Sequence, residues 1–170
     1  MQEYERLAEK TELLPIFSEH AAELDTRFGE AAELVRRAEQ IAGRAAVRSI
    51  VEAEPIGPVE QLDALVIAPC TGNTLARLNA GIADGAVTMA AKSHLRNNRP
   101  IVLALASNDG LSAAARNIAE LLNRKHYYFV PFGQDDPVGK PNSLIADFGK
   151  LFDTVEAALR GQQLQPILLR

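Results

Sequence analysis

The sequence is poor in the residues that mark secreted, membrane-bound or nucleic-acid-binding proteins. Its one cysteine, Cys70, cannot form a disulfide within the chain. No apolar stretch approaches the roughly 18 residues that a membrane-spanning helix requires, and the N-terminal residues are charged rather than typical of a signal peptide. The formal net charge is −4 and Lys and Arg are scattered, so there is no basic patch for nucleic acid. We therefore expect a cytoplasmic protein with neither a membrane nor a nucleic acid as partner.

Residue patterns for metal binding or nucleophilic catalysis are also missing. The histidines show no metal-ligand spacing, so we predict no metal site; they are His20, His94 and His126. Cys70 ends an apolar run with no histidine nearby in the sequence, which favours a small buried filler over a nucleophile. Asp135 and Asp136 are adjacent and would point to opposite sides of an extended segment, so a solvated turn is the favoured interpretation.

What is present is a regular alternation of strand-type and helix-type segments. The 170 residues are 47% hydrophobic, which allows one sizeable core, so we expect a single domain over 1–170. The almost wholly apolar runs 62–68 and 101–106 predict strands buried on both faces of a parallel sheet. We further expect helices at 74–82, 87–95, 112–122 and 151–160, and a strand at 127–130. This alternation predicts an α/β fold with a Rossmann-like or flavodoxin-like, doubly wound parallel sheet in three layers.

The N-terminal third and one later segment give weaker signals. The apolar run 12–17 predicts a strand, and 28–41 predicts a helix with possible caps at 25–26. Residues 45–53 favour a helix, followed by a turn that Pro55 and Pro58 impose. Residues 132–142 are so rich in Gly and Pro that we expect a long loop, one that approaches the length of about 12 residues beyond which loops are often functional.

Short polar residues follow both of the predicted buried strands. In an open parallel sheet, ligands bind beyond the carboxyl ends of the strands, where loops and helix N-termini converge. Two turns could therefore line one crevice; their residues are Thr71, Gly72, Asn73 and Thr74 in the first and Ser107 and Asn108 in the second. The alternative for each turn is a plain helix cap, with Thr71 or Asn73 in that role in the first.

A series of short blocks carries a resemblance to a known family. The blocks are Thr-Arg-Phe-Gly-Glu at 26–30, Ala-Glu-Pro-Ile-Gly-Pro at 53–58, Ala-Pro-Cys-Thr-Gly-Asn-Thr at 68–74, Met-Ala-Ala-Lys at 89–92, Arg-Asn-Asn-Arg-Pro at 96–100, Pro-Phe-Gly-Gln-Asp-Asp-Pro at 131–137, Lys-Pro-Asn-Ser at 140–143 and Gln-Gln-Leu-Gln-Pro-Ile at 162–167. In this order and spacing they resemble the B subunits of dipicolinate synthase.

That family is similar to a wider flavoprotein superfamily that includes phosphopantothenoylcysteine decarboxylase. The Pro-Ala-Ser-Ala-Asn-Thr turn of the decarboxylase, which contacts FMN, corresponds to 69–74 here, so the resemblance implies cofactor roles for Asn73 and Thr74. Ser107 and Asn108 correspond to a second flavin-side turn. The catalytic histidine and flap cysteine of the decarboxylases have no counterparts at 56–58 and 132–137, which argues against decarboxylation.

The resemblance implies a role in spore formation, in the cytoplasm of the mother cell. The A subunit of the synthase would carry NAD(P) and, together with this chain, oxidise dihydrodipicolinate or its hydroxy-tetrahydro precursor to dipicolinate. The crevice would hold FMN or the dicarboxylate substrate, closed by a lid formed from Phe132, Gly133, Gln134, Asp135 and Lys140. The chain would form a homo-oligomer, as these superfamily folds often do. The alternatives are a non-catalytic partner that stabilises the A subunit, and an FMN-dependent decarboxylase-like flavoprotein.

The resemblance also implies a difference at the N-terminus. Family members open with a strand and a Gly/Thr/Ser-rich phosphate-binding turn, and roughly two dozen such residues have no counterpart in this sequence. We therefore expect the sheet to lack its first strand, with weaker flavin binding as a consequence.

Overall fold

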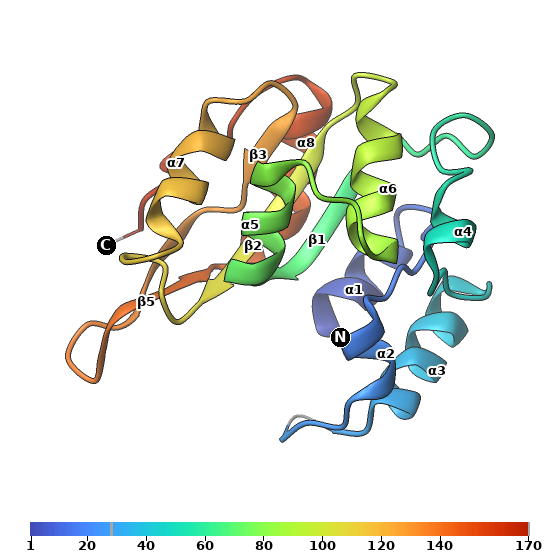
Figure 1. Ribbon diagram of the computed structural model, residues 1–170, viewed down its shortest axis with the longest axis horizontal. Coiled ribbons are helices and arrows are strands. Elements are labelled where there is room, and N and C mark those ends of the chain that lie inside the picture. The colour runs from blue at the N-terminus through green and yellow to red at the C-terminus, as the bar shows by residue number, and fades with distance from the viewer. Residues whose placement is uncertain (28, 170) are drawn as a thin grey trace.

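The computed structural model describes residues 1–27 and 29–169, and it is an α/β fold (Figure 1). In chain order the elements are α1 (Gln2–Ala8), α2 (Glu19–Glu23), α3 (Ala31–Ala42), α4 (Ile50–Ala53), β1 (Leu65–Cys70), α5 (Gly72–Ala80), α6 (Ala86–Leu95), β2 (Ile101–Ser107), α7 (Ala115–Leu122), β3 (Tyr127–Phe129), β4 (Phe132–Asp136), β5 (Lys140–Ala146), a short 3₁₀ turn (Phe148–Lys150) and α8 (Leu151–Leu159).

The sheet is organised around β2. Strand β1 pairs with β2 in parallel, and β3 pairs in parallel with the first residues of β2. The end of β2 pairs instead with β5, antiparallel, through Ala106 opposite Ile145 and Ser107 opposite Leu144. Strand β4 is antiparallel to β5. The predicted parallel sheet is thus confirmed for its core, and an antiparallel hairpin extends it.

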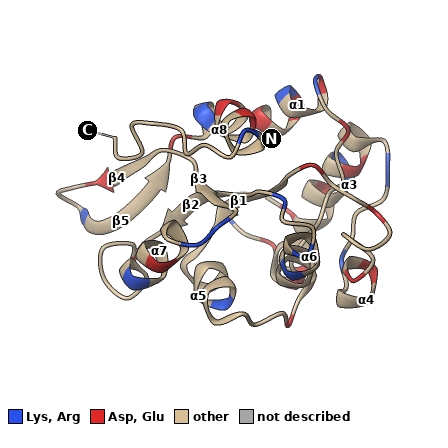
Figure 2. Cartoon of the chain, turned by 90° about the horizontal axis from the view of Figure 1, so that it is seen from above, with Lys and Arg blue, Asp and Glu red and all other residues tan. Residues whose placement is uncertain are grey.

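Helices cover both faces of this sheet, which confirms the three-layer arrangement. Helices α5, α6 and α7 lie on one face, whereas α8 and α1 lie on the other (Figure 2). The central strand is apolar throughout, and Ile101 to Leu105 are completely buried. Buried aliphatic residues of the surrounding helices pack on the sheet from both sides, among them Leu75, Leu78, Ile118 and Leu121 from one face and Leu151 and Val155 from the other.

The start and end of α5 follow from its sequence. Thr71 has extended backbone angles and its side chain accepts a hydrogen bond from the Thr74 N–H, as a helix N-cap does. At the other end Gly81 adopts a left-handed conformation (φ 70°), which a residue without Cβ reaches at little cost. These two signals begin the helix directly at the carboxyl end of β1.

Two predicted segments take other structures. The run 12–17 is not a strand, since its only ladder contact is a single bridge between Ile16 and Val47. Residues 45–53 contain that bridge and only the short helix α4, so the longer predicted helix is wrong. Helix α3 agrees with the prediction, although its N-cap is Glu30 and Asp25 instead accepts a hydrogen bond from the Ala31 N–H at 2.9 Å. The predicted start at residue 28 lies outside the described residues.

The third correction concerns residues 132–142, which are not a long loop. They form most of the β4–β5 hairpin, with the turn held by Asp136, whose Oδ1 accepts hydrogen bonds from the N–H groups of Val138 (3.2 Å) and Gly139 (2.8 Å). The hairpin extends away from the rest of the chain (Figure 1). Within the described residues, no helix has the length and apolar character needed to cross a membrane.

Candidate functional site

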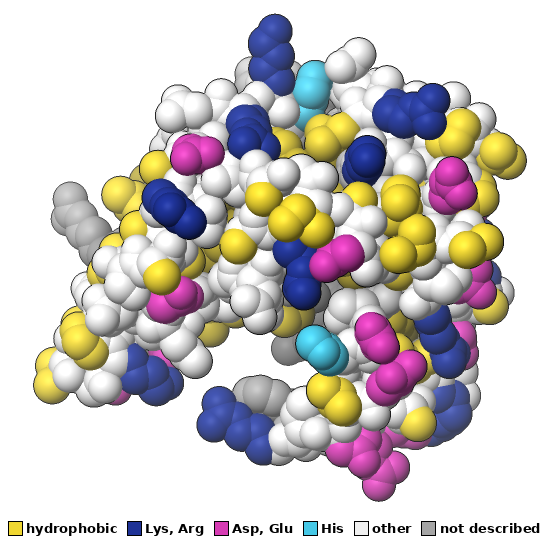
Figure 3. All heavy atoms as spheres, viewed as in Figure 1, with side chains coloured by type: hydrophobic (Ala, Val, Ile, Leu, Met, Phe, Trp, Pro, Cys, Tyr) yellow, Lys and Arg dark blue, Asp and Glu magenta, His cyan; other side chains and the backbone are white. Residues whose placement is uncertain are grey.

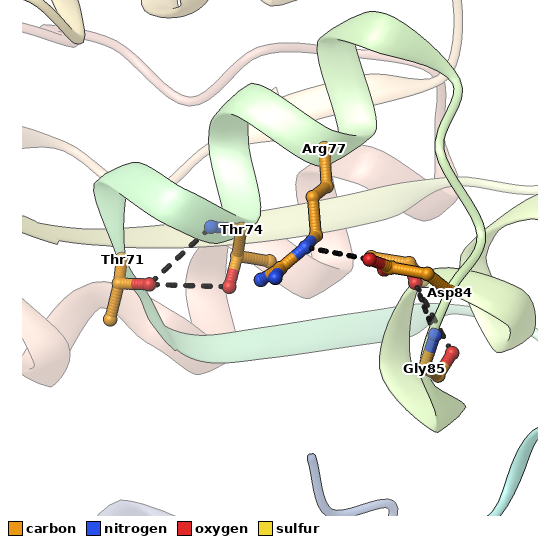
Figure 4. A network of polar contacts seen from close by, with 6 residues as sticks. Thr71, Thr74, Arg77, Asp84 and Gly85 are labelled. Carbon is orange, nitrogen blue, oxygen red and sulfur yellow. Dashed lines mark hydrogen bonds and ion pairs between the residues drawn. The ribbon is translucent and has the colours of Figure 1, made fainter. Parts of the chain in front are cut away.

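The first polar turn is partly used by its own helix cap. The Oγ atoms of Thr71 and Thr74 lie 3.2 Å apart, and Thr71 Oγ also accepts from the Thr74 N–H at 3.4 Å (Figure 4). Both threonines therefore have an internal structural role. Asn73 is different, because its exposed side chain forms no hydrogen bond with any residue that the structure describes.

The second turn contains a hydrogen-bonded pair that the sequence interpretation missed. Ser107 is buried, and its Oγ donates to Asp109 Oδ1 at 2.5 Å. The carbonyl of Asp109 in turn accepts from the N–H groups of Ser112 (2.9 Å) and Ala114 (3.2 Å), which fixes the turn before α7. Asn108 is exposed to solvent. Asp109 stands in a Ser-Asn-Asp-Gly sequence, where an Asp is equally typical of a plain turn, so residue types alone could not predict its bond to Ser107.

The two turns come into direct contact at Gly72. A Cβ atom added at Gly72 would lie 2.9 Å from both Ser107 Oγ and Asp109 Oδ1. The predicted meeting of the turns is therefore seen in the structure. The space next to Gly72 is filled by the serine–aspartate pair, so this glycine lets the two turns pack together rather than admitting a ligand.

The β4–β5 hairpin is attached to the second turn. A Cβ at Gly110 would lie 2.7 Å from the side chain of Leu144 in β5, and the Leu111 N–H donates to the carbonyl of Asn142 at 3.0 Å. The base of the hairpin is thus packed against the Ser107–Asp109 turn. The residues expected to form a lid therefore lie on a hairpin whose base contacts the candidate site.

The five residues expected in the lid have unequal surroundings. Phe132 is buried, with its ring centroid 6.0 Å from that of Phe129, and so anchors the hairpin instead of facing a ligand. Gly133 lies against the backbone of Leu169. The other three are committed to the hairpin itself, since Lys140 forms an ion pair with Asp135 at 2.7 Å and Gln134 donates to the Pro141 carbonyl at 2.8 Å.

Nucleophilic chemistry finds no support in the geometry. Cys70 is completely buried at the end of β1, and burial raises the pKa of its thiol to about 12, so the thiol is protonated at neutral pH. Across residues 1–27 and 29–169, no three His, Cys, Asp or Glu side chains gather in a way that could hold a metal ion.

A three-layer α/β fold with polar turns beyond two parallel strands defines a Rossmann-like class of protein. The Flavoprotein family matches residues 7–159, and the chain belongs to that family. Within it the chain groups with the B subunits of dipicolinate synthase: it is 47% identical to the one from Bacillus subtilis (strain 168) over 165 residues, covering 97% of this chain and 82% of the relative.

Solved structures include one B subunit of dipicolinate synthase and one decarboxylase of similar fold. The crystal structure of the dipicolinate synthase B subunit from Bacillus halodurans matches with a TM-score of 0.91 at 44% identity, covering 99% of this chain and 87% of that one. A dodecameric FMN-dependent Ubix-like decarboxylase from Escherichia coli O157:H7 matches with a TM-score of 0.60 at 26% identity, covering 76% of this chain and 70% of that one.

Proposed function

We propose that this chain is the B subunit of a dipicolinate synthase and works with the A subunit to form dipicolinate. The observation that carries this proposal is the identity of 47% across nearly the whole chain to a protein of that name. In the proposed reaction, dihydrodipicolinate loses two electrons and two protons. NAD(P)⁺ held by the A subunit takes up a hydride, and the second proton passes to solvent.

We further propose that the first turn contributes to a flavin site. The N–H groups of Gly72 and Asn73, at the start of α5, donate to no acceptor that the structure describes, and the Asn73 amide is exposed and unpaired. These groups fit the polar edge of FMN, with Asn108 on the neighbouring turn as a further contact. A bound flavin would supply two-electron redox chemistry. The hydrogen bonds that Thr71, Thr74 and Ser107 form within the two turns would hold these contacting groups in position.

Two further proposals concern the oligomeric state of the chain and the role of the β4–β5 hairpin. The dodecameric state of the Escherichia coli decarboxylase supports a homo-oligomer for this chain. The β4–β5 hairpin is also proposed to act as the lid of the site, because its base packs against the second turn. The lid would consist of Gln134, Asp135 and Lys140, with Phe132 and Gly133 as its base.

The experiment is dipicolinate formation by the purified A subunit with NAD(P)⁺, in the presence and absence of this chain, followed by ultraviolet absorbance. We expect a clear stimulation. Absence of stimulation by a chain that is folded by circular dichroism would overturn the proposal.

The flavin site is tested separately by titrating the chain with FMN and following quenching of flavin fluorescence. Asn73→Ala should weaken FMN binding about tenfold or more, because it removes a side-chain amide that no other residue of the turn can replace. The melting temperature should change little. A chain that binds no FMN and still stimulates the A subunit would identify the second candidate function, a non-catalytic partner. The internal hydrogen bonds of the two turns favour that candidate, because they leave few polar groups free.

A further inference from the structure

A cleft between α5 and α7 lies next to the first turn and borders the flavin site proposed above. It has a volume of about 430 Å³, within the range of small-molecule sites. The two helices lie beside each other on the same face of the sheet (Figures 1 and 2), and this face is the one shown in Figure 3. Asn73 lines the cleft as well as belonging to the first turn, so the two places are continuous.

The cleft is rich in hydrogen-bond donors that have no partner. The guanidinium of Arg116 is exposed and forms no ion pair or hydrogen bond with any part of the chain that the structure describes. Arg77 uses its Nε to contact Asp84 at 3.2 Å, which leaves its terminal nitrogens available (Figure 4). An arginine is always charged, and its fork of N–H groups matches a carboxylate.

The floor of the cleft is polar and incompletely hydrogen-bonded. Asn117 is more than nine-tenths buried, and its Oδ1 accepts from Asn79 Nδ2 at 3.0 Å. The Asn117 Nδ2 has no acceptor among the described residues, and Asn79 Oδ1 is buried there without a donor. Asn117 Nδ2 is a donor without an acceptor, so a carboxylate in the cleft can accept a hydrogen bond from it, whereas Asn79 Oδ1 is itself an acceptor and cannot pair with a carboxylate.

One acidic group opposes an anion in the cleft. Glu120 lines it, but the guanidinium of Arg124 lies 3.8 Å from the Glu120 carboxylate and partly balances its charge. Asp84 likewise balances the charge of Arg77, so Arg116 carries the remaining positive charge of the cleft, which has no partner among the described residues. The electrostatic balance therefore favours a ligand with at least one negative charge.

One wall of the cleft is apolar. Ile82, which follows α5, is 48% exposed, and Ala76 and Ala80 of α5 line the cleft as well. An exposed aliphatic side chain within a cleft is a suitable surface for the face of a ring. A small ring compound that carries carboxylates fits the free arginine nitrogens, the polar floor and the apolar wall of the cleft.

We propose that the α5–α7 cleft binds a ring dicarboxylate of the class that dipicolinate synthase forms, with Arg116 and Asn117 holding a carboxylate and Ile82 lying against the ring. The identity of the ligand rests on the proposed function. Because Asn73 borders both places, the ring is held next to the turn proposed for the flavin.

The test is isothermal titration of the whole chain with pyridine-2,6-dicarboxylate in metal-free buffer. Arg116→Gln should weaken binding tenfold or more, whereas Arg160→Gln, which changes an exposed arginine of the opposite helix layer, should leave it unchanged. The uncharged pyridine-2,6-dicarboxamide should bind at least tenfold more weakly than the dicarboxylate. Arg116 is exposed, so both variants should keep the melting temperature of the parent chain.

The outcomes separate this inference from the proposed function. Equal affinity of Arg116→Gln and Arg160→Gln, or no dicarboxylate binding by a chain that stimulates the A subunit, would overturn the cleft assignment and leave the synthase role standing. Binding that Arg116→Gln weakens, in a chain that does not stimulate the A subunit, would support the cleft and overturn the synthase role.

Discussion

At the scale of single residues, the packing of the candidate site depends on the absence of a side chain at Gly72. Gly72 leaves the space that Ser107 and Asp109 fill, and their hydrogen bond keeps the second turn in place. A Cβ there would approach both oxygens to 2.9 Å, closer than unstrained contacts allow. The close packing of the turns therefore requires glycine for steric reasons.

Gly72→Ala should lower the free energy of unfolding by about 1–3 kcal/mol, the usual cost of overpacking a tight contact. Urea unfolding measures this change. In a background that carries Ser107→Ala and Asp109→Ala the space is open, and the same substitution should cost much less. An equal cost in both backgrounds would show that the strain lies elsewhere.

At this scale the sequence was informative about the residue types but not about their partners. The polar turns after two apolar runs predicted where Asn73 and Ser107 would lie, because strand ends in a parallel sheet share one edge. The bond between Ser107 and Asp109 could not be assigned in the same way, since Asp109 also suits a plain turn. The Arg116 cleft was missed because it depends on how α5 and α7 pack, a contact between residues far apart in the sequence.

At the scale of elements, the sequence-based predictions were right where the local sequence determines the structure of a helix or strand. The buried strands and the helices after them agree with the predicted segments, because apolar periodicity and caps act over a few residues. The hairpin was mistaken for a loop because Gly133, Pro137 and Gly139 dominate its composition. Its strands are stabilised by distant partners instead, since β5 pairs with the end of β2.

Asp136 and Asp135 form a matched pair for testing the hairpin. Asp136 accepts two backbone N–H groups within the turn, whereas Asp135 contributes an exposed ion pair to Lys140. Exposed ion pairs contribute little because water screens them. Asp136→Ala should therefore speed hydrogen exchange of the β4 and β5 amides severalfold, and Asp135→Ala should change it little.

Amide exchange followed by mass spectrometry distinguishes the two variants without a change in the core. The β2 amides, in the buried centre of the sheet, provide the internal reference and should exchange at the same rate in all three proteins. Equal acceleration by both substitutions would mean that the turn is not held by the Asp136 carboxylate.

At the scale of the whole molecule, a buried histidine joins α6 to the sheet. His94 is completely buried, and its Nε2 lies 3.0 Å from the Pro100 carbonyl, where α6 leads into β2. A proton on Nε2 donates to that carbonyl, and Nδ1 then has no partner among the described residues. Burial lowers the pKa of His94, with Arg99 acting in the same direction and the Pro100 carbonyl and Asp63 opposing it. The folded protein therefore holds this ring neutral.

The stability of the whole fold should fall between pH 7.5 and pH 5.5 because of His94. Above the unfolded pKa of about 6.5 the ring is neutral in both states. As the pH falls below that value, the unfolded chain binds a proton that the folded chain resists, and stability is lost at up to about 1.4 kcal/mol per pH unit until the folded pKa is passed. Glu39 and Glu52, whose pKa values are lowered by hydrogen bonds, lose their contribution only at more acidic pH. His94→Gln keeps an amide donor for the Pro100 carbonyl and does not titrate, so urea unfolding at the two pH values should show a smaller difference for this variant than for the parent chain. The same pH dependence in both proteins would place the responsible group elsewhere in the fold.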